Sequence, residues 1–160
     1  MITIEQEILE FLNRNQIVYA VREHEPVYTS VQMAKFLETD EDHIAKSMIL
    51  KSNNEYLLVV LPGKQKINFS RLGRILGAKS ICLASASEAE NIAKCGVGSV
   101  HPFGNLLNLR TYFDQKLLNT QYVFFNPGSH TKSIKIKTTD LLKLVKPSVI
   151  EFTKSADQSL

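Results

Sequence analysis

A buried hairpin constrains the fold of this chain more than any other segment. Residues 57–61 are all Leu or Val, so a strand there is apolar on both faces and belongs in the middle of a sheet. A Pro-Gly pair follows directly and ends the strand. Residues 52–54, Ser-Asn-Asn, form a turn because asparagine tolerates left-handed backbone. We therefore predict a hairpin of strands 46–50 and 55–61.

Helices and strands alternate along the rest of the chain. Apolar residues at helical spacing, each run preceded by a capping residue, predict helices at 4–13, after Thr29, at 69–76, from Ser85 or Ser87 to about 94, and from Thr138 or Thr139 to 145. Runs rich in β-branched and aromatic residues predict strands at 17–21, 81–84, 107–114, 121–126 and 133–137. This mixture predicts an α+β or mixed α/β fold around one sheet.

Length and composition indicate one globular domain. We expect it to cover residues 1–152, with a polar tail at 153–160. Neither a transmembrane helix, which needs about 20 apolar residues, nor the pattern of a secretory signal is present in the sequence, so we expect a cytoplasmic protein without a membrane partner. Cys82 lies in an apolar run and is expected to be buried, whereas Cys95 lies at a helix end where a reactive thiol is conceivable.

The charge balance is only mildly basic. The net charge of +3 does not by itself predict nucleic-acid binding. Basic residues nevertheless gather in two places, either of which could contact phosphate or be a solvated face: Lys64, Lys66, Arg71 and Arg74, and then Lys132, Lys135, Lys137, Lys143 and Lys146.

Residues 96–105 contain three glycines and a proline, which excludes the interior of a helix or strand. A stiff loop of this kind can present backbone amides to a phosphate or to a developing oxyanion. The simpler alternative is a sharp connection between a helix and a strand.

Two further positions could carry chemistry. Lys46 could be a solvated strand end, or a fixed ammonium in a cleft that binds a phosphate or a carbonyl oxygen. His130, in a Pro-Gly turn at 125–134, could orient water, accept a proton or only bond to the loop backbone. The histidines and cysteines show no metal-ligand spacing, and neither a phosphate-binding P-loop nor a dinucleotide motif is present in the sequence.

In series, these segments resemble the YbaK/ProX family of aminoacyl-tRNA deacylases and the editing domain of bacterial prolyl-tRNA synthetase. The resemblance covers about residues 26–147 and rests on Lys46, on the strand and Pro-Gly pair at 56–63, and on the segments 98–104 and 125–130. It implies a mixed, partly barrel-like sheet surrounded by helices.

The resemblance also implies site residues. Lys46 matches the family's essential lysine, and Gly98 and Ser99 are assigned with it as catalytic, the latter two through backbone amides that receive the oxyanion. The expected substrate-binding residues are Gly96, His101, Pro102, Phe103, Gly104, Asn126, Gly128 and His130. A catalytic role for His130 stays open, because the family varies at this wall of the pocket.

The implied function is hydrolysis of the ester that joins a wrong, small amino acid (Ala, Ser, Thr or Cys) to a tRNA. The expected partners are aminoacyl-tRNA and, in some family members, an aminoacyl-tRNA synthetase; no metal, cofactor or DNA is implied. An aminoacyl ester is already activated, so positioned water and an oxyanion site suffice. The alternatives are a catalytically silent module of the same fold that binds tRNA or a synthetase, and a hydrolase of another activated ester.

Overall fold

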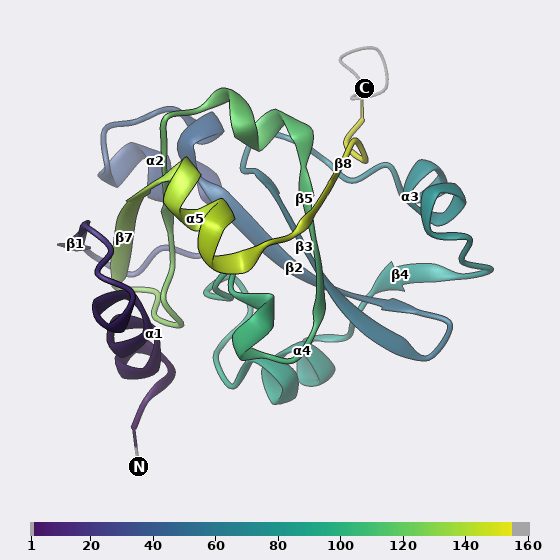
Figure 1. Cartoon of the computed structure of the whole chain (residues 1–160), viewed down its shortest axis with the longest axis horizontal. Helices are drawn as coiled ribbons and strands as arrows, with labels where there is room; N and C mark the ends of the chain where they lie inside the picture. The colour runs from purple at the N-terminus through teal and green to yellow at the C-terminus, as the bar shows by residue number, and fades with distance from the viewer. Residues whose placement is uncertain (1, 155–160) are drawn as a thin grey trace.

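The computed structural model describes residues 2–154 and contains two β-sheets with helices packed around them (Figure 1). The larger sheet has the strand order β4-β2-β3-β5-β8. Its centre is the predicted hairpin of β2 (Ala45–Ser52) and β3 (Glu55–Pro62). Asn53 and Asn54 form the turn with positive φ angles of 50° and 70°, as the sequence predicts.

Parallel and antiparallel pairs are mixed in this sheet. β4 (Ile81–Leu83) pairs antiparallel to the end of β2, whereas β5 (Arg110–Asp114) runs parallel to β3 and β8 (Ser148–Ile150) runs parallel to β5. β8 was not expected from the sequence. It has three residues after Pro147, too few for a periodic signal.

The second sheet is an antiparallel set of three strands in the order β1-β7-β6. These are β1 (Tyr19–Glu23), β7 (Lys132–Lys137) and β6 (Tyr122–Phe125). An isolated bridge between Ile44 and Phe124 joins the two sheets. The mixed α+β prediction is confirmed, with the strands divided between two linked sheets instead of one.

Within residues 2–154, four of the five α-helices begin after the capping residue that the sequence predicts. The last helix differs: its N-cap is Lys137, without a side-chain hydrogen bond, and not the expected Thr138 or Thr139. Thr3 and Ser85 form complete capping boxes, and Thr29 and Asn68 accept hydrogen bonds from the first turns of their helices. The helices are α1 (Ile4–Arg14), α2 (Ser30–Phe36), α3 (Phe69–Leu76), α4 (Ala86–Ala93) and α5 (Thr138–Val145). Short 3₁₀ turns lie at Glu41–His43, Gly104–Leu106 and Gln115–Asn119.

The main core lies between the two sheets. It joins inward-facing side chains of β2, β3, β5, β6 and β7 with α1 and α5: among them Ile8, Ile49, Val60, Phe113, Phe125, Ile136 and Leu141. A second core packs α3 and Phe152 against the other face of the larger sheet. A third lies under α2, where Met33 and Leu37 meet Ile44 and Phe124. These cores fix the start of β2 relative to α2 and the loop after α4.

Two expectations about exposure are wrong. Cys82 is exposed, because β4 is an edge strand whose residues are only partly covered. Thr153 and Lys154 do not belong to a tail: Thr153 is buried and bridges to Ile67, and the Lys154 amide donates to the Lys66 carbonyl at 2.8 Å. The rest of the expected tail, residues 155–160, lies outside the described residues.

Candidate active site

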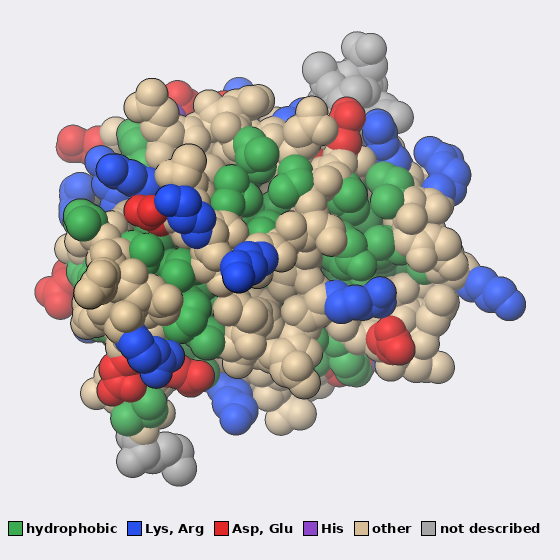
Figure 2. Space-filling model, viewed as in Figure 1, with side chains coloured by type: hydrophobic (Ala, Val, Ile, Leu, Met, Phe, Trp, Pro, Cys, Tyr) green, Lys and Arg blue, Asp and Glu red, His purple; other side chains and the backbone are tan. Residues whose placement is uncertain are grey.

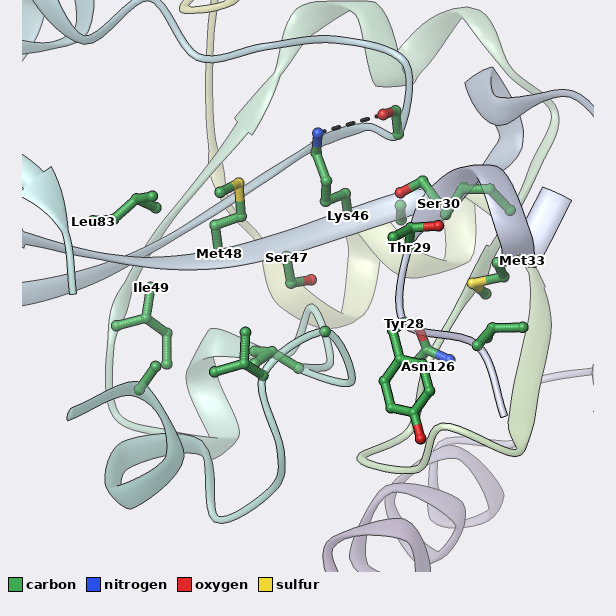
Figure 3. Close-up of a pocket in the computed structure, with 18 of the residues that line it drawn as sticks. Tyr28, Thr29, Ser30, Met33, Lys46, Ser47, Met48, Ile49, Leu83 and Asn126 are labelled. Carbon is green, nitrogen blue, oxygen red and sulfur yellow. Dashed lines mark hydrogen bonds between the residues drawn. The ribbon is translucent and has the colours of Figure 1, made fainter. Parts of the chain in front are cut away.

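A cavity of about 510 Å³ opens at the free edge of β2 (Figure 3). Its walls come from residues 27–31 before and within α2, residues 44–49 at the start of β2, residues at the start of α4, and the loop after α4. β4 pairs with β2 only from Leu50 to Ser52, so the first half of β2 has an uncovered edge. The cavity occupies the place that a longer β4 would fill.

Lys46 lines this cavity and is held by the loop that follows β3. Its Nζ donates to the carbonyls of Gly63 at 3.3 Å and Gln65 at 2.9 Å. Burial lowers the pKa of Lys46, with Glu41 opposing this effect and Lys66 adding to it. An ammonium has three N–H donors, so one is left for a ligand after these two contacts.

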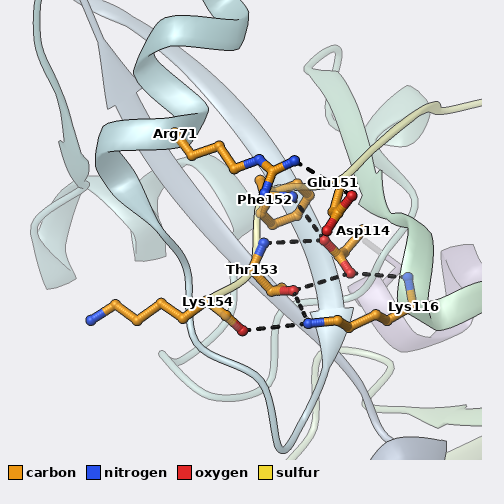
Figure 4. A network of polar contacts seen from close by, with 7 residues as sticks. All are labelled: Arg71, Asp114, Lys116, Glu151, Phe152, Thr153 and Lys154. Carbon is orange, nitrogen blue, oxygen red and sulfur yellow. Dashed lines mark hydrogen bonds and ion pairs between the residues drawn. The ribbon is translucent and has the colours of Figure 1, made fainter. Parts of the chain in front are cut away.

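A polar network braces the loop that holds Lys46 (Figure 4). Asp114 is fully buried and accepts hydrogen bonds from the amides of Phe152 at 2.9 Å and Thr153 at 3.2 Å. Lys116 Nζ donates to Thr153 Oγ1 at 2.9 Å and to Gln65 Oε1 at 3.3 Å. The last described residues of the chain thereby fix the position of the carbonyls that hold Lys46.

The front half of the glycine-rich loop reaches the cavity. Val97, Gly98 and Val100 line it. Gly98 has φ +91°, and a Cβ there would lie 3.0 Å from the Tyr28 carbonyl oxygen, so this position requires glycine. The Gly98 amide has no hydrogen bond within the described part of the chain. It is therefore free to donate to a ligand.

Ser99 faces away from the cavity. It is fully buried, its amide donates to the Gly96 carbonyl at 3.1 Å, and its hydroxyl donates to the same oxygen at 2.7 Å. Its own carbonyl accepts from the Gly128 amide at 3.0 Å. Ser99 therefore closes the turn, and its amide is already used, contrary to the expected pair of amide donors.

His130 supports the loop from behind the cavity wall. A Cβ at Gly96 would lie 2.9 Å from His130 Nε2, so this glycine makes room for the imidazole. The other ring nitrogen, Nδ1, hydrogen-bonds with the Val27 carbonyl at 3.0 Å, and the ring packs on Tyr28 with centroids 4.6 Å apart. Gly96 and His130 do not line the cavity. Their contacts fix Tyr28, which does.

The back half of the glycine-rich segment is part of the core. Pro102 is buried, Phe103 is fully buried against Phe11 and Phe125, and a Cβ at Gly104 would overlap the side chain of Thr111. His101 is 1% exposed, accepts from the Phe103 amide at 3.1 Å, and has its pKa lowered to about 4 by burial. These four residues were expected to bind substrate, but the structure places them behind the cavity wall.

The residues expected to form the second wall of the pocket, in the segment 125–130, also lie partly in the cavity lining and partly behind it. Asn126 lines the cavity while its Nδ2 donates to the Ser129 and Lys132 carbonyls at 3.3 and 3.2 Å. Gly128, with φ +84°, packs against Ile4 and does not line it. Burial raises the pKa of the Cys95 thiol, which disfavours a reactive thiolate there.

Of the expected residues, the cavity thus brings together Lys46, Gly98 and Asn126. Sequence reasoning missed Tyr28 and Ser47, which also line it. Ser47 follows Lys46 directly, so its position next to a candidate cation was the available signal. Within residues 2–154 there is no cluster of three or more potential metal ligands, and no helix there is long and apolar enough to span a membrane.

Comparison with known proteins places this geometry in a family. The family model described as "Aminoacyl-tRNA editing domain" matches residues 24–144, which include every cavity-lining residue. The chain is 29% identical over 147 residues to the prolyl-tRNA editing protein ProX of Acetoanaerobium sticklandii, covering 88% of this chain and 90% of ProX. It is 26% identical over 156 residues to the multifunctional Ser/Thr-tRNA deacylase ProXp-y of Escherichia coli, covering 94% and 93% of the two chains.

Larger proteins and solved structures agree with this placement. The chain matches a proline–tRNA ligase of Caldicellulosiruptor saccharolyticus at 28% identity, covering 82% of this chain but 21% of the ligase. A crystal structure of a candidate trans-editing enzyme for prolyl-tRNA synthetase superposes with a TM-score of 0.84 at 19% identity, covering 97% of this chain and 99% of that one, which shows the same fold. The chain belongs to the family of aminoacyl-tRNA editing domains.

Proposed function

We propose that this protein is a trans-editing deacylase, which hydrolyses the ester of a tRNA mischarged with a small amino acid. The observation that carries the proposal is that one cavity is lined by both Lys46, which keeps one N–H without a partner, and Gly98, whose amide makes no hydrogen bond within residues 2–154. The names of ProX and ProXp-y support it, because both describe proteins that act on charged tRNA.

The reaction needs little from the protein beyond positioning. Water adds to the ester carbonyl, the carbonyl oxygen becomes an oxyanion, and the bond to the 3′-oxygen of the terminal ribose then breaks as that oxygen takes a proton. The Gly98 amide is the candidate donor to the oxyanion, since the Ser99 amide already bonds to Gly96. Removing one such donor costs roughly 3–4 kcal/mol in well-studied hydrolases.

Lys46 is proposed to bind the terminal nucleotide or the ester carbonyl through its remaining N–H. Gly63 and Gln65 hold the ammonium in place, so the charge is pre-organised and no side-chain ordering is needed when the substrate arrives. A half-buried lysine with a lowered pKa is also a feature of functional sites.

The apolar cavity wall matches a small amino acid. Ala84, Ala86 and Ala89 reach the cavity from the start of α4, and Val97 and Val100 reach it from the loop. A wall of this kind separates side chains of different size by only about 1–3 kcal/mol per methylene. Alanine, serine, threonine and cysteine therefore all remain candidates on size alone.

Contacts to the tRNA body are proposed at the loop that holds Lys46. Lys64 and Lys66 are exposed there, beside the carbonyls of Gly63 and Gln65. On the face shown in Figure 2, Lys and Arg side chains are scattered and do not form one continuous patch. On that face, phosphate groups would meet separate basic side chains and not one continuous basic surface.

The test is a deacylation assay of the purified protein with alanine, serine, threonine and cysteine on proline, alanine, serine and threonine tRNAs. Release of a small amino acid is expected, and Lys46→Ala should lower kcat/KM at least 100-fold without changing the thermal unfolding midpoint by more than a few degrees. Lys143→Ala is the control, because it removes the same charge from the exposed side of α5. Tight binding of tRNA without hydrolysis of any ester would indicate a silent binding module instead.

A further inference from the structure

We propose that Ser47 determines which amino acid is removed: its hydroxyl hydrogen-bonds the side-chain hydroxyl of a seryl or threonyl ester. This inference rests on the proposed deacylase function and specifies its substrate class. It starts from one unusual atom, since Ser47 Oγ is buried and has no hydrogen-bond partner within residues 2–154. Buried hydroxyls are normally paired, so an orphan in a cavity indicates a group that the ligand satisfies.

The side chains of Ser47 and Lys46 lie on opposite faces of β2. Because successive side chains of a strand point to opposite faces, Lys46 turns toward Gly63 and Ser47 turns away from it (Figure 3). Ile49 shares the face of Ser47 and packs in the core with Val100 and Ala89. The hydroxyl is therefore set among small apolar groups, where the side chain of a small amino acid would fit.

Three other polar side chains in the cavity already make hydrogen bonds. Lys46 donates to two carbonyls, Asn126 donates to two carbonyls, and Thr29 Oγ1 accepts from the Gln32 amide to cap α2. Ser47 Oγ differs because both its donor and its acceptor capacity are unused. It can accept from or donate to a ligand hydroxyl.

The backbone of Ser47 can hold the part of the substrate that all amino acids share. The Ala84 amide donates to the Ile49 carbonyl at 3.1 Å, so the main-chain groups of Ile49 point to the outer edge of β2. Strand backbone alternates, and Ser47, two residues earlier, directs its amide and carbonyl to the same edge. β4 does not reach this position, which leaves the carbonyl available to an α-ammonium group.

This arrangement predicts discrimination by polarity and not by size. A site built to pair with a hydroxyl rejects an analogue that lacks it, because the protein hydroxyl is then left unsatisfied. Alanine would fit the same space but leave Ser47 Oγ without a partner. Cysteine would offer only a weak S–H donor.

The experiment compares one tRNA body charged with serine, threonine or alanine. For the unmodified protein we expect kcat/KM for the seryl ester to exceed that for the alanyl ester about tenfold or more. Ser47→Ala should lower the Ser:Ala ratio about tenfold while leaving the alanyl rate within about twofold, and Ser47→Thr should retain the preference. Ser30→Ala is the control, since it removes a hydroxyl from the Gly63 side of the same cavity.

A binding measurement separates this inference from the proposed reaction. Calorimetry with non-hydrolysable 3′-amide analogues of seryl- and alanyl-adenosine should show the same preference, and the same loss in Ser47→Ala, even if no ester is cleaved. An unchanged Ser:Ala ratio in Ser47→Ala would overturn the inference. So would an equal loss on all three esters, because Ser47 would then contact a group common to every amino acid.

Discussion

The two halves of the glycine-rich segment have different surroundings. Val97, Gly98 and Val100 line the cavity, with Gly98 in a left-handed conformation against the Tyr28 carbonyl. Residues 101–104 are buried in the main core, where Phe103 packs on Phe11 and Phe125. The front half presents an amide, and the back half anchors it. A motif that is continuous in sequence is thus divided between a binding surface and its support.

The largest expected effect tests the anchoring half. Phe103→Ala should lower the free energy of unfolding by about 3–5 kcal/mol, because it leaves a cavity beside two aromatic rings. Urea unfolding followed by circular dichroism measures this. Phe36→Ala is the control at a 44% exposed position and should cost far less. If folded Phe103→Ala protein lost its specificity for one amino acid, the back half would belong to the binding surface after all.

The next effect tests the presenting half. Gly98→Ala should lower kcat/KM for deacylation about 100-fold, since a side chain at φ +91° is strained and presses on the Tyr28 carbonyl. Gly77→Ala is the matched control. Gly77 lies at the end of α3 with φ +64°, and an added Cβ there has no atom within 4 Å. Both variants carry backbone strain of about 1–2 kcal/mol, but only Gly98→Ala should lose activity. Equal activity of the two variants would show that the loop is only a connection.

A smaller effect separates His101 from a substrate-binding role. Burial lowers the pKa of His101 to about 4, against an ordinary value near 6.5, so the unfolded chain binds more protons between these pH values. Stability is then complete above pH 6.5 and decreases as the pH falls toward 4. Between pH 7.5 and pH 5 the loss due to this group is about 2 kcal/mol.

The control for this pH effect is His101→Asn, which keeps an acceptor for the Phe103 amide but does not titrate. Urea unfolding of both proteins at the two pH values measures the difference. The variant should have the shallower pH dependence. If both proteins lost the same stability, His101 would not be the buried group responsible, and its place behind the wall would need another explanation.

Much of the fold could be predicted because its signals are local. Asn53 and Asn54 adopt the left-handed turn expected of them, Gly77 ends α3 at φ +64°, and Thr3, Thr29, Asn68 and Ser85 cap their helices. Each of these depends on a few adjacent residues. The apolar run of β3 likewise predicts a central strand whatever lies on either side of it.

The candidate site could be predicted only in part. The resemblance pointed to Lys46 and Gly98, and both line the cavity. It also pointed to Ser99, His101 and Phe103, which are buried behind it. Whether a loop residue faces the cavity or the core depends on its backbone conformation and on the elements packed against it. The spacing of Gly and Pro along the sequence does not specify these.

By itself, the sequence determined the helices, the tight turns and every strand but the three-residue β8, since capping hydroxyls, glycines and apolar periodicity act over one or two turns of chain. Only the tertiary structure decided that β4 is too short to cover the first half of β2, and that α2, α4 and the glycine-rich loop surround the exposed edge. The physical reason is that a cavity forms where elements distant in the sequence pack around a space without filling it. The unpaired hydroxyl of Ser47 results from that long-range packing, and not from its neighbours in the chain.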